Sequence, residues 1–196
     1  MKSNEEGLVE QQLEAAAEAA EQSSLEESAE ERSLFSIYGI SVEHPMDWLL
    51  FFDPKRPFNR TTGFFRIEDY VPRKGANISL SINWEMTPCD NVTFAERYCE
   101  NIAAQYRRQF KKNPYVIECA DIVDFGQGKA AYLVSEHGAN LGIVKKKSTE
   151  QVRILQLAFY DEHSGRAVVG SVIGHPEKIR EKEAFFKELL FTIKCN

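Results

Sequence analysis

The segment 37–48, which reads IYGISVEHPMDW, marks where a folded domain begins in this chain. The pattern from Phe35 to Val42 predicts a β-strand, and Pro45 ends it because proline fixes φ and has no N–H to donate. Residues 1–33 are mostly Glu, Ala, Gln and Ser, which cannot furnish a hydrophobic core. We therefore predict a disordered or partly helical tail at residues 1–33 and one domain at residues 34–196.

The acidity of the protein belongs to this tail. The whole chain carries a formal net charge of −6, but residues 1–33 hold ten Glu against only Lys2 and Arg32. The tail therefore has a net charge of −8, which leaves +2 on residues 34–196. A nearly neutral domain argues against nucleic acid as the partner.

Three further strand patterns follow the opening one, at residues 48–52, 63–68 and 77–84. The last has the cleanest alternation in the chain, with apolar Ile78, Leu80, Ile82 and Trp84 on one face and Asn77, Ser79, Ser81 and Asn83 on the other. One face of this strand should be buried, while the other is wet or covered by polar groups. The intervening residues 53–62 contain two prolines and predict a loop that carries Lys55, Arg56 and Arg60.

A central helix of about five turns is predicted next. Thr93 and Glu96 have the spacing of a capping box, and Asn113-Pro114 should stop the helix. Its apolar stripe consists of Ala95, Cys99, Ile102, Tyr106 and Phe110. Four cations, Arg107, Arg108, Lys111 and Lys112, gather in the last turns, where they favour the negative end of the helix dipole.

The sequence pattern after the central helix predicts a mostly antiparallel meander and a closing helix. Strand patterns occupy residues 115–125, 129–137, 141–146, 151–160 and 167–173, and their short connections suit hairpins. The closing helix starts at Pro176, and its apolar face comprises Ile179, Ala184, Phe186, Leu189, Leu190 and, beyond them, Ile193. Helices packed on a twisted antiparallel sheet give an α+β fold class.

This arrangement resembles the PsbP-like superfamily, which includes the extrinsic PsbP protein of photosystem II and the Mog-type Ran-binding factors. The resemblance rests on Gly39, Pro45 and Trp48 around the opening strand, on the order of elements, and on the closing pattern Phe186-x-x-Leu189-Leu190-x-x-Ile193. It implies an α/β/α sandwich that binds through a surface. It implies no shared catalytic constellation, so no functional residue is carried over.

The sequence contains no recognisable catalytic, metal or cofactor motif. His44, His137, His163 and His175 are scattered, and Cys89, Cys99, Cys119 and Cys195 match no zinc or redox spacing. Reduced thiols, the lack of a signal peptide and the lack of a membrane-spanning apolar run predict a cytoplasmic protein without a membrane role.

We accordingly predict a non-enzymatic adaptor, chaperone or assembly factor that binds another protein through its sheet face and loops. The candidate partner-binding residues are the cations Lys55, Arg56, Arg60, Arg107, Arg108, Lys111, Lys112, Lys145, Lys146 and Lys147. The alternative is a small-molecule-binding domain or minor enzyme. Its pocket would lie between the sheet and the central helix and be lined by Trp84, Tyr106, Tyr132 and Tyr160.

Overall fold

The computed structural model describes residues 31–72, 77–109, 115–126, 128–138 and 151–196. Contacts divide the chain between Arg32 and Ser33, and Ser33–Asn196 form one compact unit. The strands are β1 (Arg32–Ile37), β2 (Ile40–Pro45), β3 (Leu49–Phe52), β4 (Thr62–Glu68), β5 (Ile78–Met86), β6 (Tyr115–Phe125), β7 (Gly128–Gly138), β8 (Gln151–Asp161), β9 (Arg166–Gly174) and β10 (Lys194–Cys195). The described helices are α2 (Asn91–Gln109), α3 (Pro176–Glu181) and α4 (Glu183–Phe191).

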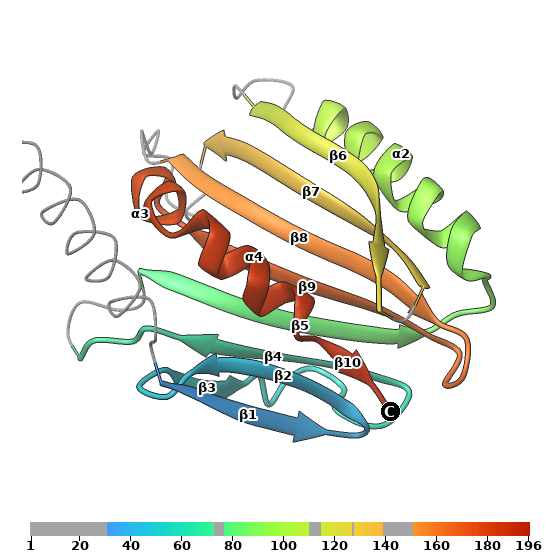
Figure 1. The fold of residues 1–196 in the computed structure, drawn as a ribbon, viewed down its shortest axis with the longest axis horizontal. Coiled ribbons are helices and arrows are strands. Elements are labelled where there is room, and N and C mark those ends of the chain that lie inside the picture. The colour runs from blue at the N-terminus through green and yellow to red at the C-terminus, as the bar shows by residue number, and fades with distance from the viewer. Residues whose placement is uncertain (1–30, 73–76, 110–114, 127, 139–150) are drawn as a thin grey trace, which may run out of the picture. The chain divides into compact units, whose positions relative to one another are not determined.

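The main sheet has seven strands in the order β3-β4-β5-β9-β8-β7-β6, and a smaller sheet has the order β1-β2-β10. Every neighbouring pair in the main sheet is antiparallel. The predicted meander is confirmed, because β6, β7, β8 and β9 are neighbours in chain order (Figure 1). The strand predicted at residues 141–146 lies outside the described residues.

The larger core lies between the main sheet and the helices α3 and α4. The alternation of β5 is confirmed, since Ile78, Leu80, Ile82 and Trp84 are all buried in this core. Four side chains of the C-terminal helices, Ile179, Phe186, Leu189 and Leu190, pack into the same core. Burial stabilises each such side chain by about 1.5–3 kcal/mol, which fixes both helices on this face.

The opposite face of the sheet carries α2, which packs on β6, β7 and β8. The interface is a second, smaller core in which Ala95 of α2 meets Ala131, Leu133 and Ala158 of the sheet. Figure 1 shows α4 in front of the sheet and α2 along β6 and β7. The predicted α+β class and α/β/α sandwich are therefore confirmed.

None of the described helices is both long and apolar enough to cross a membrane.

The central helix begins earlier than its predicted capping box. Its length of 19 residues agrees with five turns, but Asp90 rather than Thr93 caps the N-terminus. The Asp90 side chain accepts a hydrogen bond from the Thr93 amide at 2.8 Å, and the Asp90 carbonyl accepts one from the Phe94 amide at 3.0 Å. Hydrogen bonds from Thr93 lower the pKa of Asp90. The predicted end of the helix lies outside the described residues.

The single opening strand predicted over residues 35–42 is wrong, because the chain folds there into the hairpin of β1 and β2. Its turn residues Tyr38 and Gly39 have φ values of 53° and 78°. Positive φ at both central residues is the conformation of a type I′ turn, which suits the twist of antiparallel strands. A Cβ on Gly39 would also lie 2.4 Å from the carbonyl oxygen of Asn196. This close approach follows from β10, a short strand that the sequence pattern did not predict.

The predicted closing helix is two helices, α3 and α4, which are separated at Lys182. Pro176 is the first residue of α3, as predicted. Lys182 has φ −120° and ψ 28°, so the helical backbone is interrupted there. The interruption turns Ala184 to solvent, and its predicted place on the apolar face is wrong.

Candidate binding groove on the open half of the sheet

On the α2 side, one half of the main sheet is not covered by any helix in the described part of the chain. Because α2 packs on β6, β7 and β8, no described helix covers β4 and β5 from this side. The side chains that β5 presents there include Ser79, Ser81, Asn83 and Glu85. We call this surface, formed by the α2-side faces of β4, β5 and β9, the open half of the sheet. The polar face predicted for residues 77–84 therefore lies on the same side of the sheet as α2, next to this helix but not covered by it.

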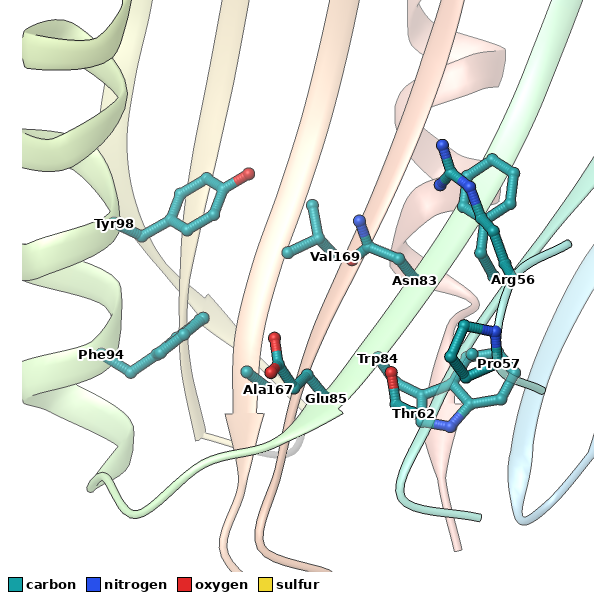
Figure 2. A pocket seen from close by; sticks show the side chains of 12 residues that line it. Arg56, Pro57, Thr62, Asn83, Trp84, Glu85, Phe94, Tyr98, Ala167 and Val169 are labelled. Atoms are coloured by element: carbon teal, nitrogen blue, oxygen red, sulfur yellow. The ribbon is translucent and has the colours of Figure 1, made fainter. Parts of the chain in front are cut away.

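A groove of about 350 Å³ lies on the open half, between α2 and the loop that joins β3 to β4. Figure 2 shows Phe94 and Tyr98 projecting from α2 on one side, with Arg56 and Pro57 of the loop on the other. The floor consists of side chains from β4, β5 and β9. The full lining is Arg56, Pro57, Thr62, Gly63, Phe64, Asn83, Trp84, Glu85, Phe94, Tyr98, Ala167 and Val169.

Strand register places the floor residues side by side. Asn83 of β5 pairs with Phe64 of β4 and with Val169 of β9. Two residues further on, Glu85 pairs with Thr62 and Ala167 in the same way. Residues two apart on a strand point to the same face, so these two rows together form one continuous floor.

Gly63 and Trp84, which pair across β4 and β5, also line the groove. The Trp84 Nε1–H donates a hydrogen bond to the carbonyl of Asn59 at 3.0 Å, which ties the loop to the sheet. The Asn59 side chain in turn accepts hydrogen bonds from the amides of Thr61 and Thr62. The loop wall of the groove is therefore held in place by its own hydrogen bonds.

Three polar side chains of the groove have no hydrogen-bond or ion-pair partner among the described residues: Asn83, Glu85 and Tyr98. Asn83 and Glu85 are exposed. Burial raises the pKa of Tyr98 well above its usual range, so its hydroxyl stays protonated and can donate a hydrogen bond. These groups and three aromatic rings line the same groove.

Arg56 is already engaged within the chain. Its guanidinium lies 4.5 Å from the centre of the Phe64 ring, and its Nε lies 3.3 Å from a carboxylate oxygen of Asp53. Both side chains of this ion pair are exposed, so the pair contributes little to stability. It does offset much of the positive charge at the rim of the groove.

The four aromatic residues predicted to line one pocket lie on both faces of the sheet. Trp84 and Tyr132 belong to the larger core, on the face of the sheet opposite α2. Tyr106 lies on the other face, where its hydroxyl is 3.1 Å from the Ser135 hydroxyl. Tyr160 contacts Phe94 on that face, with ring centres 6.3 Å apart. The predicted pocket is therefore wrong in its lining, because alternate residues of a strand face opposite sides, and of the four only Trp84 lines the groove.

The predicted cationic residues do not meet at one place in the described part of the chain. Lys55, Arg56 and Arg60 are exposed in the loop between β3 and β4, and only Arg56 lines the groove. Arg107 and Arg108 lie in the last turn of α2, about 20 Å along the helix from Phe94. Lys111, Lys112, Lys145, Lys146 and Lys147 lie outside the described residues. Partner binding by these residues stays a prediction.

A cluster of charged groups lies on the α4 face, around the buried Arg153. Its Nη1 contacts Glu118 at 2.8 Å and Glu136 at 2.7 Å, and its Nη2 contacts Glu183 at 2.7 Å. A register shift between Ile117 and Cys119 coincides with Glu118 in β6. The hydrogen bond from Arg153 lowers the pKa of Glu118. The cluster joins three strands to the start of α4, which is a structural role.

A second buried cluster centres on Arg166. It donates hydrogen bonds to the Ser164 hydroxyl at 2.9 Å, the Tyr38 carbonyl at 2.8 Å and the Cys195 sulfur at 2.9 Å. Asp161 accepts hydrogen bonds from the amide and the hydroxyl of Ser164. Burial raises the pKa of Cys195, so this inaccessible thiol is a poor nucleophile. The cluster connects the β8–β9 turn to the small sheet.

The histidines do not form a site either. His137 contacts Tyr106 on the α2 side, whereas its neighbour Glu136 bonds Arg153 on the other side. Among the residues that the structure describes, no three His, Cys, Asp or Glu side chains are placed to hold a metal ion. The four cysteines are not in disulfides.

Comparison with solved structures identifies the fold. The chain is similar to CyanoP, the cyanobacterial PsbP of Synechocystis, with a TM-score of 0.60 and 10% identity over 84% of this chain and 92% of that one. It also matches PA94, a Pseudomonas aeruginosa protein of unknown function, with a TM-score of 0.47 and 12% identity over 84% of this chain and 97% of that one. A third match is LpqN, which is involved in cell envelope biogenesis of Mycobacterium tuberculosis, with a TM-score of 0.42 and 11% identity over 85% and 87% of the two chains.

The likeness to CyanoP confirms the PsbP-like fold that the sequence resembles. At 10% identity it shows the fold alone. No protein-family model and no curated protein matches the chain.

Proposed function

We propose that this chain, which has the PsbP-like fold, is a non-enzymatic protein-binding module that acts as an adaptor, chaperone or assembly factor. Its partner would lie on the open half of the sheet and insert side chains into the groove. The loop cations Lys55, Arg56 and Arg60 would lie beside it. A cytoplasmic location stays part of this proposal.

The observation that carries the proposal is the unmatched polar lining of an open groove. Asn83, Glu85 and Tyr98 have hydrogen-bonding groups that no described residue satisfies, next to the rings of Phe64 and Phe94. Protein interfaces combine apolar anchors with a polar rim in this way. The exposed Asn83, Glu85, Arg56 and Pro57 leave the groove open to solvent, which suits side chains from a larger surface.

A second candidate function is the binding of a small molecule in the same groove. It is favoured by the volume of about 350 Å³, which lies at the lower end of the range for ligand sites. Small-molecule sites usually enclose most of the surface of their ligand. Four residues of the lining, Arg56, Pro57, Asn83 and Glu85, are exposed, which favours the protein partner.

A photo-crosslinking experiment followed by a binding measurement tests the protein-binding proposal. A photoreactive phenylalanine analogue at position 83, on the groove floor, should capture one defined protein in the source cells. The same analogue at position 188, on the exposed surface of α4, should not capture it. Candidate partners are then purified and measured against the full chain by calorimetry.

The matched variants for calorimetry are Asn83→Trp and Val116→Trp. Asn83→Trp fills the groove on an exposed strand position that tolerates aromatic residues, and should weaken binding at least about tenfold. Val116→Trp adds the same side chain to the exposed edge strand β6 and should leave binding unchanged. Equal affinities of the two variants would refute the proposal. Binding of a small metabolite instead of a protein, lost in Asn83→Trp, would favour the second candidate.

A further inference from the structure

The two charged side chains in the lining of the groove do not neutralise each other. Its lining contains one cation, Arg56, and one carboxylate, Glu85. Arg56 is paired with Asp53 at 3.3 Å and lies over the Phe64 ring. Glu85 is exposed and makes no ion pair with any described residue. The groove therefore presents one uncompensated negative charge.

Two arginines of the neighbouring strands are engaged elsewhere and form no ion pair with Glu85. Arg66, which shares the open half of the sheet, is paired with Glu68 at 2.9 Å. Arg166 lies close in register, opposite Met86, but it is buried and bonds to Ser164, Tyr38 and Cys195. The negative potential at the groove floor is thus available to a ligand.

Aromatic side chains stand beside this carboxylate. Figure 2 shows Glu85 between Phe94 of α2 and the Thr62–Trp84 side of the groove, with Tyr98 one helical turn from Phe94. The rings of Phe94 and Tyr98 lie 5.9 Å apart at a tilt of 36°. Aromatic faces attract cations and also pack against the apolar stems of long basic side chains.

We propose that the groove binds a lysine or arginine side chain of the protein partner. This inference rests on the proposed function and specifies the chemistry of the partner. The cationic head forms an ion pair with Glu85 and donates to the Asn83 amide oxygen, while its methylene stem packs against Phe94 and Tyr98. An acidic side chain is disfavoured because it would meet Glu85 while Arg56 is already paired with Asp53.

The test uses three capped tripeptides that differ only at the central residue: acetyl-Ala-Arg-Ala-amide, acetyl-Ala-Glu-Ala-amide and acetyl-Ala-norleucine-Ala-amide. Each is titrated into the full-length protein to about 10 mM while amide resonances are followed by NMR, since single side chains bind with about millimolar affinity. The arginine peptide should shift the resonances of Asn83, Glu85, Tyr98 and Val169. The glutamate peptide should not, and norleucine should give a weaker effect at the same residues.

The matched variants are Glu85→Gln and Glu96→Gln, which remove one negative charge each from exposed positions. Glu85→Gln should weaken arginine-peptide binding at least about fivefold, and salt raised from about 0.05 to 0.5 M should weaken it in the unmodified chain. Glu96→Gln, outside the groove, should bind as the unmodified chain does. Absence of groove shifts with the arginine peptide, equal shifts with the glutamate peptide, or unchanged binding by Glu85→Gln would overturn the inference.

Failure of this inference is distinguishable from failure of the proposed function. If Asn83→Trp abolishes partner binding while Glu85→Gln leaves it unchanged, the groove binds a partner through a side chain that is not basic. If neither variant alters partner binding, the groove is not the binding site and the proposed function itself is wrong.

Discussion

Gly63 and Trp84 face each other across β4 and β5 so closely that a Cβ on the glycine would lie 2.1 Å from the indole ring. The indole cannot easily move, because its Nε1–H is bonded to the Asn59 carbonyl and its ring packs against Phe58 and Phe65. The absence of a side chain at position 63 therefore lets the core tryptophan reach the floor of the groove.

Gly63→Ala should lower the free energy of unfolding by about 1–3 kcal/mol, because overpacking at a rigid aromatic forces backbone shifts. Urea unfolding measures this change. The control is Gly126→Ala, at a turn where an added Cβ meets nothing within 4 Å. Its free energy of unfolding should change by less than about 1 kcal/mol, and a cost equal to that of Gly63→Ala would contradict the packing argument.

Arg153→Met should be strongly destabilising. The arginine is buried and holds three carboxylates from β6, β7 and α4, and its removal would leave them close together with only the half-exposed Arg180 in contact with one of them. Breaking such a cluster costs about 3 kcal/mol of unfolding free energy. Arg180→Met is the matched control, because Arg180 contacts the same Glu136 but its side chain is 50% exposed. The control should cost less than about 1 kcal/mol in urea unfolding, and a loss as large as that of Arg153→Met would show that burial does not decide the effect.

The contribution of Asp161 to stability should depend on pH. Burial by itself would raise the pKa of Asp161, but hydrogen bonds from Ser164 outweigh it and lower the pKa in the folded state. A depressed folded-state pKa stabilises the protein above the unfolded pKa of about 3.9, and this stabilisation is lost as pH falls through the folded value.

Asp161→Asn should therefore cost about 1–3 kcal/mol at pH 7, and the difference from the unmodified chain should shrink below about pH 4. Urea unfolding at a series of pH values measures it. Asp124→Asn, at a side chain that is 91% exposed, should change the free energy of unfolding by less than about 0.5 kcal/mol throughout. If the difference in unfolding free energy between Asp161→Asn and the unmodified chain grew as the pH fell, the lowered pKa of Asp161 in the folded state would be refuted.

Cys119 should alkylate slowly near neutrality. Burial and the hydrogen bond that its thiol donates to Asp121 at 3.1 Å raise its pKa to about 11. Since only the thiolate reacts, its rate with iodoacetamide should rise about a hundredfold from pH 8 to pH 10. An ordinary thiol, such as the same residue in urea, should rise less than about tenfold. Mass spectrometry of the Cys119 peptide gives the alkylation rates in the folded protein and in urea. If the ratio of the rates at pH 10 and pH 8 were the same in both, the raised pKa of Cys119 would be contradicted.

Strand alternation was the strongest predictor of the fold. Ile78, Leu80, Ile82 and Trp84 are buried as their two-residue period indicates, and Asn83 on the opposite face is exposed. The first hairpin was missed because Tyr38 and Gly39 lie within an apolar run, and the positive φ values that turn the chain there leave no trace in hydrophobicity. The capping role of Asp90 could have been found, since an aspartate three residues before Thr93 is itself a capping signal.

Only part of the lining of the groove could be predicted from the sequence. The wet face of β5 follows from the sequence, and it includes Asn83. Phe94 and Tyr98 flank the apolar stripe of α2, and their position beside the floor depends on where the helix packs across the sheet. The position of the helix depends on the packing of three small side chains, Ala95 of α2 against Ala131 and Ala158 of the sheet. These residues lie far apart in the sequence. The predicted aromatic pocket is wrong for a different reason, because Trp84 and Tyr132 lie on one face of the sheet and Tyr106 and Tyr160 on the other.

The most direct test of partner binding at the groove is cysteine footprinting of the complex. Asn83→Cys and Glu188→Cys place a thiol at exposed positions on the groove floor and on α4, and each full-length variant is alkylated with and without the purified partner. We predict that the partner slows alkylation at position 83 at least about tenfold, as burial of a reactive thiol requires, and leaves position 188 unaffected. Equal alkylation at position 83 in the free and bound protein would contradict the account.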